Sequence, residues 1–251
     1  MKLYIHPRYS NYETFIRSIP QENYERETVF CNRRNVVEKV KVEEQTFVIK
    51  KFKRPTWANC LIYTWFRRSK PRRAFENAQL LLEKGFETAR PVAYIEIKKW
   101  GFFHTGYFIS EFLPYPLLRE LMKKENHFNP EERGQFEADF IAFTAKLHEE
   151  GILPLDYNSG NIFYYHENGK YRFALIDINR MKHGKQPKEK ASMRSFVQLG
   201  VNFAESVSII KQYATLRNFN LEECLFFGLL QRFRINNKRK FKHLLHQCLR
   251  K

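Results

Sequence analysis

Short runs in the first part of the chain alternate apolar and polar residues, a pattern typical of half-buried β-strands. Polar residues at Glu43-Glu44-Gln45 separate two of these runs and predict a tight turn. Trp100-Gly101 separates two further runs. The pattern predicts a β-rich region with strands over Thr28–Cys31, Val36–Val42, Phe47–Phe52, Pro91–Lys98 and Gly106–Phe112.

Helical periodicity interrupts this region once and begins again in the second half. Residues Ser69–Lys84 repeat apolar side chains on one face, with Pro71 in the first turn and Gly85 after the last. A longer helix begins at Asn129-Pro130-Glu131-Glu132, where a capping side chain precedes proline and glutamate, and it ends at Gly151. The sequence therefore predicts one helix inside the β-rich region and a second one after it.

A hairpin and more helices follow. The strand-like runs Asn161–Tyr165 and Tyr171–Ile176 lie on either side of the turn sequence Glu167-Asn168-Gly169. From about Lys190 the chain is mostly helical, and prolines mark a crossing between the two regions near Glu111–Pro116. We predict an α+β fold with a β-rich N-lobe over residues 1–113 and a mainly helical C-lobe over residues 114–251. A ligand is expected in the cleft between the lobes.

Composition narrows the class of protein. The 251 residues are 43% hydrophobic and include 24 Phe and 13 Tyr, which suffices for a sizeable core and argues against long disorder. The four cysteines are far apart and contain no Cys-x-x-Cys pair, so we expect reduced thiols of a cytoplasmic protein. The longest apolar runs are far shorter than the roughly 18–20 residues that span a bilayer. No transmembrane segment is predicted.

The charge points to an anionic partner. The chain has 44 basic and 27 acidic residues, a net charge of +17. Two acid-free segments, Lys50–Arg73 with nine basic residues and Arg232–Lys251 with eight, account for the whole excess. Phosphorylated lipid, nucleotide and nucleic acid would each be attracted to such segments.

One of these segments also carries an apolar stripe. If the residues between Arg54 and Arg68 form a helix, one face is made by Trp57, Leu61, Ile62, Trp65 and Phe66. Tryptophans beside arginines are typical of a helix that lies in a membrane interface. An amphipathic helix packed on the N-lobe explains the same pattern equally well.

Three polar residues of the C-lobe form the most informative pattern. Asp156 and Asn161 lie five residues apart in a loop after a long helix, and Asp177 ends an apolar strand after the predicted hairpin. This arrangement resembles the catalytic loop and the metal-binding aspartate of the protein-kinase-like superfamily. Phosphoryl transfer needs positioning and charge neutralisation. Asp156 suits the group that takes the acceptor proton, and Asn161 and Asp177 offer the oxygen ligands that Mg²⁺ prefers.

Candidate nucleotide-binding residues precede this loop. Val48 and Lys50 share one face of a predicted strand, which suits an apolar contact with adenine and an ammonium on the α/β-phosphates of ATP. Lys51 would lie on the other face. Glu76, on the following helix, is placed to hold Lys50 by an ion pair.

The segment that joins the lobes completes the set. Ile109–Leu113 fits a hinge whose backbone groups, at Glu111 and Leu113, would bond the adenine edge. Each candidate residue taken alone is an ordinary loop, helix or turn residue. Their combination in one order, from the strand lysine to the final aspartate, favours a kinase.

Within this superfamily the chain is most similar to the lipopolysaccharide core sugar kinases, the Kdo kinase and heptose kinase family. The similarity runs from about Thr28 to Arg180. It is carried by Val48-Ile-Lys-Lys-Phe-Lys, Ser69-Lys-Pro-Arg-Arg-Ala-Phe-Glu76-Asn-Ala, Arg90-Pro-Val-Ala, Asp156-Tyr-Asn-Ser-Gly-Asn161-Ile and Ile176-Asp177-Ile-Asn-Arg180-Met.

The resemblance implies an enzyme and its surroundings. It implies ATP- and Mg²⁺-dependent phosphorylation of a Kdo or heptose hydroxyl on a lipopolysaccharide or lipid A-core precursor. It also implies action at the cytoplasmic face of the inner membrane. The basic segments and the tryptophan stripe then predict a cytoplasmic protein held peripherally on that face. An anionic membrane surface is then the expected partner of the basic segments, and no nucleic acid is expected.

Three departures from the kinase pattern leave alternatives open. Thr28–Gln45 contains no glycine, so side chains between Asn32 and Asn35 would have to contact phosphate in place of backbone amides. Pro154 stands where the family often has a structural histidine, and Asp177-Ile-Asn replaces Asp-Phe-Gly. A degraded kinase without turnover, a kinase acting on small molecules or proteins, and a basic nucleic-acid-binding protein are the alternatives.

Overall fold

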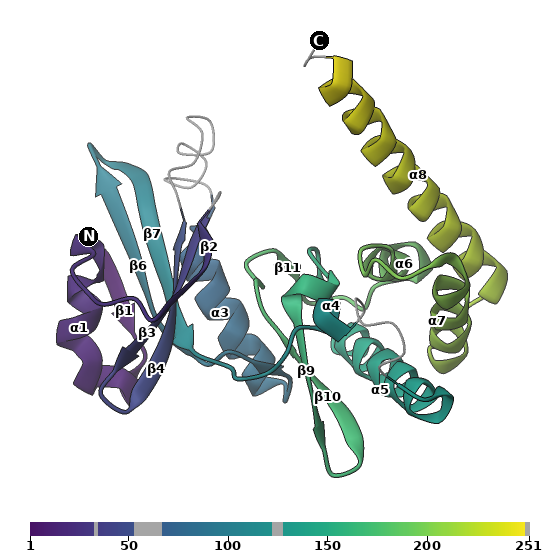
Figure 1. Ribbon diagram of the computed structural model, residues 1–251, viewed down its shortest axis with the longest axis horizontal. Helices are drawn as coiled ribbons and strands as arrows, with labels where there is room; N and C mark the ends of the chain where they lie inside the picture. Colours follow the sequence, from purple (N-terminus) through teal and green to yellow (C-terminus); the bar gives the residue numbers. More distant parts are fainter. Residues whose placement is uncertain (33–34, 53–66, 122–127, 249–251) are drawn as a thin grey trace. The chain divides into compact units, whose positions relative to one another are not determined.

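The computed structural model describes residues 1–32, 35–52, 67–121 and 128–248, with the backbone alone for residues 238–248 (Figure 1). The chain divides into two compact units. Unit 1 contains Met1–Pro114 and Ala174–Arg180, and unit 2 contains Tyr115–Phe173 and Met181–Lys251. From the sequence, residues 174–180 are predicted to belong to the C-lobe, whereas the structure groups them with the N-terminal unit.

A six-stranded antiparallel sheet forms unit 1. Its strand order is β1-β6-β7-β4-β3-β2. The five predicted strands are present, with ends shifted by a few residues, and β1 is added beside β6. The strands are β1 (Lys2–Ile5), β2 (Thr28–Asn32), β3 (Asn35–Val42), β4 (Gln45–Phe52), β6 (Pro91–Lys99) and β7 (Phe102–Glu111).

A layer formed by the N-terminal residues covers one face of this sheet. It consists of the short helices η1 (Pro7–Tyr12), α1 (Glu13–Ser18) and η2 (Ile19–Gln21). Their apolar side chains are buried against alternate residues of the sheet. The sequence pattern predicts no element in residues 1–27. The main members of this core are Tyr9, Ile16, Ile19, Phe47, Ile49, Ile95 and Ile109.

Helix α3 (Lys70–Glu83) packs on the opposite face, against β6 and β7. Pro71 occupies the first turn, as predicted, and Ser69 caps the helix by accepting a hydrogen bond from the Arg72 amide. Gly106 lets the helix approach closely, because a Cβ there would lie 2.7 Å from Cγ of Pro71. The predicted helix is thus confirmed as a packed layer on the sheet.

Unit 2 contains mostly helices. The predicted long helix is α5 (Pro130–Glu149), and the predicted capping box forms between Asn129 and Glu132. The predicted hairpin is formed by β9 (Ile162–Glu167) and β10 (Lys170–Leu175). The remaining elements are α4 (Leu118–Leu121), β8 (Leu153–Pro154), η4 (Ser159–Asn161), β11 (Met181–Lys182), α6 (Glu189–Val197), α7 (Phe203–Leu216) and α8 (Leu221–Cys248).

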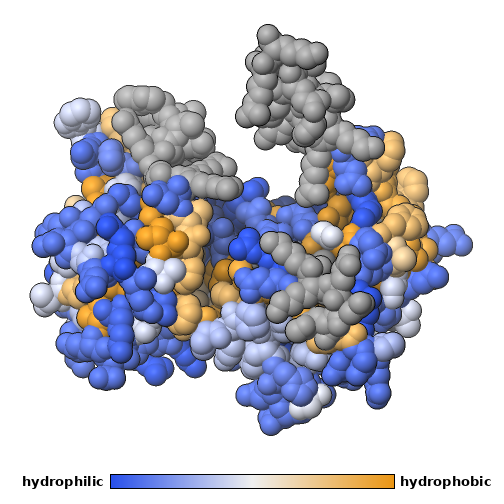
Figure 2. Space-filling model, in the orientation of Figure 1, coloured by the Kyte–Doolittle hydropathy of each residue, from blue (hydrophilic) through white to orange (hydrophobic). Residues whose placement is uncertain are grey.

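The surface of unit 2 includes exposed apolar side chains on α8. Figure 2 shows hydrophobic surface beside α8, and this helix carries two phenylalanines, Phe226 and Phe233, that are more than half exposed. Its last turns contain Lys238, Arg239, Lys240 and Lys242. Of the helices in the described ranges, none has the length and apolarity needed to cross a membrane.

Candidate active site

Strand β4 separates two lysines. Phe47 and Ile49 face the core beneath the N-terminal layer, so Val48 and Lys50 lie on the opposite face of the strand. Lys51 is on the core side, where its ammonium pairs with Glu22. Burial lowers the pKa of Lys51, but the bond to Glu22 and the charges of Tyr107 and Glu22 together outweigh burial and raise that pKa overall. Lys51 therefore anchors the N-terminal layer and is engaged away from Lys50.

The ammonium of Lys50 contacts Asp177. Lys50 Nζ lies 2.5 Å from Asp177 Oδ1, and both side chains are largely but not fully buried, with 14% and 32% exposed. The same carboxylate oxygen accepts a hydrogen bond of 2.6 Å from Asn179 Nδ2. The structure thus brings together two candidate residues that are far apart in sequence.

Two buried polar side chains hold the Asp177 segment in unit 1. Asn77 of α3 donates to the Ile178 carbonyl at 2.6 Å. Thr88 donates to the Leu175 carbonyl, also at 2.6 Å, and β10 pairs there in parallel with β5 (Glu87–Thr88). Neither residue was singled out from the sequence. The only signal for Asn77 was a polar residue next to the apolar face of a predicted helix.

Glu76 does not pair with Lys50 in the described part of the chain, and the predicted ion pair is wrong for this structure. Its carboxylate accepts hydrogen bonds from Arg72 Nε at 2.8 Å and from Arg68 Nη1 at 2.9 Å. Arg72 lies one helical turn before Glu76, so it is a local partner at little conformational cost. Lys50 meanwhile has Asp177 within contact distance.

The predicted hinge is bonded through most of its backbone. The Glu111 amide donates to the Arg90 carbonyl, and the Phe112 amide donates to the Thr46 carbonyl. The Glu111 carboxylate accepts a bond of 2.6 Å from the Tyr9 hydroxyl. Burial, assisted by this bond, raises the pKa of Tyr9. The Leu113 amide has no backbone acceptor among the described residues, so it can donate to a ligand.

Hydrogen bonds to one carbonyl shape the loop around Asp156. The Asp156 carbonyl accepts from the Asn158 amide at 3.0 Å, from Asn158 Nδ2 at 3.1 Å and from Asn161 Nδ2 at 2.9 Å. The structure therefore brings Asp156 and Asn161 together within unit 2. Because Asn161 donates through its amino group, its Oδ1 atom can serve as a hydrogen-bond acceptor or as a metal ligand.

A buried tyrosine fixes this loop to α5. Tyr157 is 1% exposed, stacks on Phe140 and hydrogen bonds through its hydroxyl to Thr144 Oγ1 at 2.7 Å. Burial raises the pKa of Tyr157, so it remains a neutral anchor. Pro154, the departure noted in the sequence, lies in β8 and pairs with Met181 of β11. The loop is thereby held from both sides of Asp156.

The donor set fits Mg²⁺ in its chemistry. Mg²⁺ favours oxygen ligands and commonly takes one or two carboxylates, with substrate phosphates and water completing its shell. Asp177 can supply a carboxylate oxygen and Asn161 an amide oxygen. Within the described ranges, no group of three or more His, Cys, Asp or Glu residues forms a protein-only metal site. The residues therefore suit a metal that binds together with a phosphate substrate.

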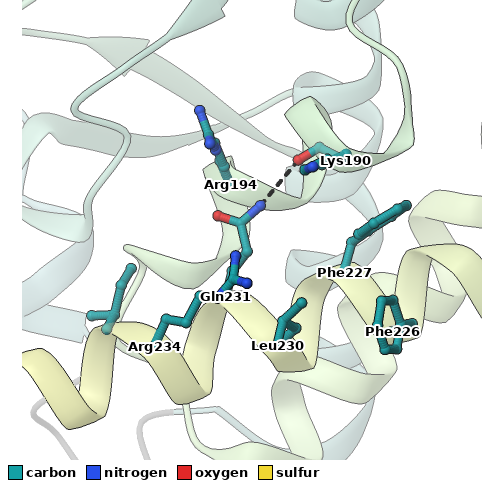
Figure 3. A pocket seen from close by; sticks show the side chains of 8 residues that line it. Lys190, Arg194, Phe226, Phe227, Leu230, Gln231 and Arg234 are labelled. Atoms are coloured by element: carbon teal, nitrogen blue, oxygen red, sulfur yellow. Dashed lines mark hydrogen bonds between the residues drawn. The ribbon is translucent and has the colours of Figure 1, made fainter.

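A separate groove lies between α6 and α8 in unit 2 (Figure 3). Its volume is about 360 Å³, and Gln231 Nε2 donates to the Lys190 carbonyl across it at 3.1 Å. The aromatic ring of Phe227 lies 5.7 Å from Lys190 Nζ. Neither Asp156 nor Asn161 contributes to its lining. The lining residues are Lys190, Arg194, Phe226, Phe227, Leu230, Gln231, Arg234 and Ile235.

Comparison with protein families identifies the chain. Residues 17–218 match the Lipopolysaccharide kinase (Kdo/WaaP) family. The chain belongs to this family. The family is one of kinases, so its members are phosphotransferases that use ATP. The resemblance stated from the motifs around Lys50, Asp156 and Asp177 is thus confirmed at the level of the family.

A solved structure confirms the fold. The structure titled "WaaP in complex with acyl carrier protein" matches with a TM-score of 0.66 and 15% sequence identity, covering 95% of this chain and 99% of that chain. The predicted α+β, protein-kinase-like fold with an antiparallel sheet in its N-terminal unit is therefore correct. A search of the curated proteins found no match.

Proposed function

We propose that this protein is an ATP-dependent kinase that phosphorylates a sugar hydroxyl, of Kdo or heptose, on a lipopolysaccharide inner-core or lipid A precursor. The observation that carries the proposal is the 2.5 Å contact between Lys50 and Asp177. A phosphate-binding ammonium and a metal-binding carboxylate must serve the same triphosphate, so they must lie close together. Membership of the lipopolysaccharide kinase family supports the class of acceptor.

The nucleotide site is proposed on the face of β4 that carries Lys50. Val48 contacts the adenine, and Lys50 binds the α- and β-phosphates. The Glu111 carbonyl and the Leu113 amide bond the adenine edge. This assignment is supported by the engaged amides of Glu111 and Phe112, which leave Leu113 as the hinge donor within the described chain. Glu76 acts at this site only indirectly, through the guanidinium groups that it holds.

Asn161 and Asp177 are proposed as the protein ligands of Mg²⁺. Bound Mg²⁺ would neutralise phosphate charge during transfer. Asp177 can turn one carboxylate oxygen to Lys50 and Asn179 and keep the other for the metal. Asn161 can use Oδ1 because its amino group is bonded to the Asp156 carbonyl.

Asp156 is proposed to act on the acceptor. Its carboxylate orients the sugar hydroxyl and takes the hydroxyl proton as the oxygen attacks the γ-phosphorus. The new bond joins the sugar oxygen to phosphorus, and the bond from phosphorus to the β,γ-bridging oxygen breaks. ADP leaves with that oxygen, and Asp156 later returns its proton to water. The loop geometry held by Tyr157 and Asn161 keeps the carboxylate in place for this step.

The membrane is proposed as the place of action. A lipid-linked acceptor lies at a bilayer surface, and a net charge of +17 favours the anionic leaflet that carries it. We therefore propose peripheral association with the inner face of the inner membrane. The stripe Trp57–Phe66, whose pattern is typical of membrane binding, lies outside the described residues.

Mass spectrometry of the reaction products tests the activity. The protein is incubated with ATP, Mg²⁺ and a lipopolysaccharide core precursor, intact or delipidated. We expect one added phosphate on Kdo or heptose. Asp156→Asn should lower transfer by at least about a hundredfold. Asp139→Asn is the matched control. The side-chain oxygen introduced there can still accept the hydrogen bond that the Tyr171 backbone N–H donates to Asp139 at 2.8 Å.

The same experiment separates the alternatives. ATP binding without phosphate transfer would identify a degraded kinase. Salt-sensitive RNA binding without ATP turnover would favour a nucleic-acid-binding protein. Equal transfer by the wild type and Asp156→Asn would remove Asp156 from the mechanism.

A further inference from the structure

The turn that joins β6 to β7 has an unusual residue at its tip. Lys99 pairs with Phe102, so Trp100 and Gly101 are the two central residues of a tight hairpin turn (Figure 1). Both have positive φ angles, +50° for Trp100 and +80° for Gly101. Two-residue hairpin turns with positive φ at both positions strongly favour Asn-Gly or Asp-Gly. A tryptophan in this conformation is strained, because its Cβ crowds the following carbonyl.

A second hairpin turn of this chain can be compared with the β6–β7 turn. The turn between β9 and β10 has Asn168 at φ +51° and Gly169 at φ +73°, nearly the same backbone with the preferred residue pair. Asparagine tolerates the left-handed region far better than an aromatic residue does. The β6–β7 turn therefore holds tryptophan where another hairpin of the same protein holds the residue that folding favours.

No contact with the described residues offsets the backbone strain at Trp100. Trp100 is 93% exposed. Within the described chain, it has no ring stacking, cation–π or hydrogen-bond partner. A large indole in water and a strained backbone are both unfavourable. Nothing in the described part of the chain therefore accounts for Trp100.

The charges beside Trp100 indicate what binds it. Lys98 and Lys99 directly precede it, and both are exposed. Neither forms an ion pair with a described carboxylate. They also lie outside the two acid-free segments, Lys50–Arg73 and Arg232–Lys251. An amphipathic indole next to lysines is the combination that occupies the interface of an anionic bilayer.

We propose that the β6–β7 tip, residues Lys98–Gly101, is a membrane-interface anchor. The Trp100 indole enters the headgroup region of an anionic bilayer, and the ammonium groups of Lys98 and Lys99 contact lipid phosphates. This inference deepens the proposed function, on which it rests, because it names an element that holds the kinase at the membrane of its acceptor. Membrane binding is measured without ATP, so it can fail or succeed independently of phosphate transfer.

Co-sedimentation with vesicles of phosphatidylcholine and phosphatidylglycerol tests the anchor. Trp100→Asn copies the Asn168-Gly169 turn and should keep or raise the melting temperature, while lowering the partition coefficient roughly tenfold. Trp100→Phe retains an apolar ring and should lose much less. Unchanged binding by Trp100→Asn at an undiminished melting temperature would overturn the proposal.

Charge variants test the two lysines. Lys98→Gln with Lys99→Gln should weaken binding to vesicles that contain phosphatidylglycerol. Binding to vesicles of phosphatidylcholine alone should change little. The matched control is Lys41→Gln with Lys170→Gln, which removes the same charge from exposed positions beside two other hairpin turns. Equal losses in both double variants would show an effect of net charge and overturn the role of Lys98 and Lys99.

Fluorescence locates the indole directly. The chain has three tryptophans, so Trp57→Phe with Trp65→Phe leaves Trp100 as the single reporter. Vesicles should shift its emission to shorter wavelength, and lipids brominated near the headgroup should quench it. An unshifted and unquenched emission on vesicles that bind the protein would overturn insertion. Phosphate transfer to a delipidated acceptor should be equal in wild type and Trp100→Asn.

Discussion

Both the backbone and the side chain of Asp177 are constrained. Its backbone is in the left-handed region at φ +55°, while its carboxylate meets Lys50 and Asn179. Such a conformation persists only when surrounding contacts determine it, and it is concentrated at functional sites. Here the neighbouring Ile178 carbonyl is held by Asn77. At the scale of single residues, the site therefore depends on contacts that fix a carboxylate in place.

The partner of Lys50 gives the first prediction. Lys50→Met and Asp177→Ala should each lower phosphate transfer at least about a hundredfold, and the double variant should be little worse than either. Glu76→Gln should have a much smaller effect, because Glu76 bonds to arginines. Steady-state transfer rates check this. If Glu76→Gln lost as much activity as Lys50→Met, the result would show that Lys50 and Glu76 pair during turnover.

A buried histidine gives a prediction on pH. His148 is fully buried, with Nδ1 2.6 Å from the Tyr213 hydroxyl and Nε2 3.3 Å from Ser195 Oγ. Burial, with a smaller contribution from Arg217, lowers the pKa of His148 to about 3. The folded state keeps this histidine neutral where the unfolded chain, with a pKa near 6.5, takes up a proton. Its contribution to stability is therefore complete above pH 6.5 and is lost as the pH falls toward 3.

Urea unfolding at pH 7 and pH 5 measures this effect. Between these values, His148 should lower the free energy of unfolding by about 2 kcal/mol. His148→Gln should be less stable at pH 7, because it disturbs the bonds to Tyr213 and Ser195. It should nevertheless lose about 2 kcal/mol less than the wild type on going to pH 5. An equal loss in the two proteins would assign the acid sensitivity to other groups.

At the scale of elements, the end of α5 determines where the Asp156 loop begins. Gly151 has φ +70°, and the Ile152 amide donates to the Leu147 carbonyl, which closes the helix in a Schellman motif. A Cβ on Gly151 would lie only 2.3 Å from the Gly184 carbonyl oxygen. Helix termination and the close passage of two chain segments thus meet at one glycine.

Two alanine substitutions separate these effects. Gly85→Ala tests backbone strain alone, because Gly85 has φ +75° and nothing within 4 Å of an added Cβ. It should cost about 1 kcal/mol of stability. Gly151→Ala adds the clash with Gly184 and should cost about 3 kcal/mol or more. Thermal or urea unfolding checks the order, and equal costs at the two positions would show that the loop at Gly184 gives way freely.

At the scale of the whole molecule, charge is distributed unevenly along the chain. The acid-free end of α8 carries Lys238, Arg239, Lys240 and Lys242, whereas Trp100 provides an apolar contact in unit 1. Electrostatic attraction to an anionic leaflet is screened by salt, but burial of an indole is not. The two contributions to membrane binding should therefore respond differently to ionic strength.

Salt dependence tests this division. Vesicle binding by the wild type should fall between about 0.1 and 1 M salt, as the Debye length falls from about 10 to about 3 Å. Changing Lys238, Arg239, Lys240 and Lys242 to Gln should reduce binding at low salt and flatten the salt dependence. Trp100→Asn should lower binding at both salt concentrations and keep the slope. The same slope after the fourfold change in α8 would exclude this helix from membrane binding.

The sequence by itself determined the main elements after residue 27 and their order. Alternating strands, Pro71 in the first turn of a helix, the Asn129–Glu132 capping box and the Asn168-Gly169 turn are local patterns, and each appears in the structure. The close spacing of Asp156 and Asn161 is also local, and the structure joins them by a hydrogen bond. Local patterns are readable because neighbouring residues along the chain determine them.

Only the tertiary structure decided the long-range contacts. In the tertiary structure, Lys50 pairs with Asp177 rather than with Glu76. Residues 174–180 belong to unit 1, where Asn77 and Thr88 hydrogen bond to carbonyl groups of this segment. The tertiary structure also laid residues 7–21 over the sheet. These contacts join segments far apart in sequence, so no periodic pattern along the chain predicts them. A carboxylate takes whichever cation the packed elements bring nearest, and that is settled by the fold.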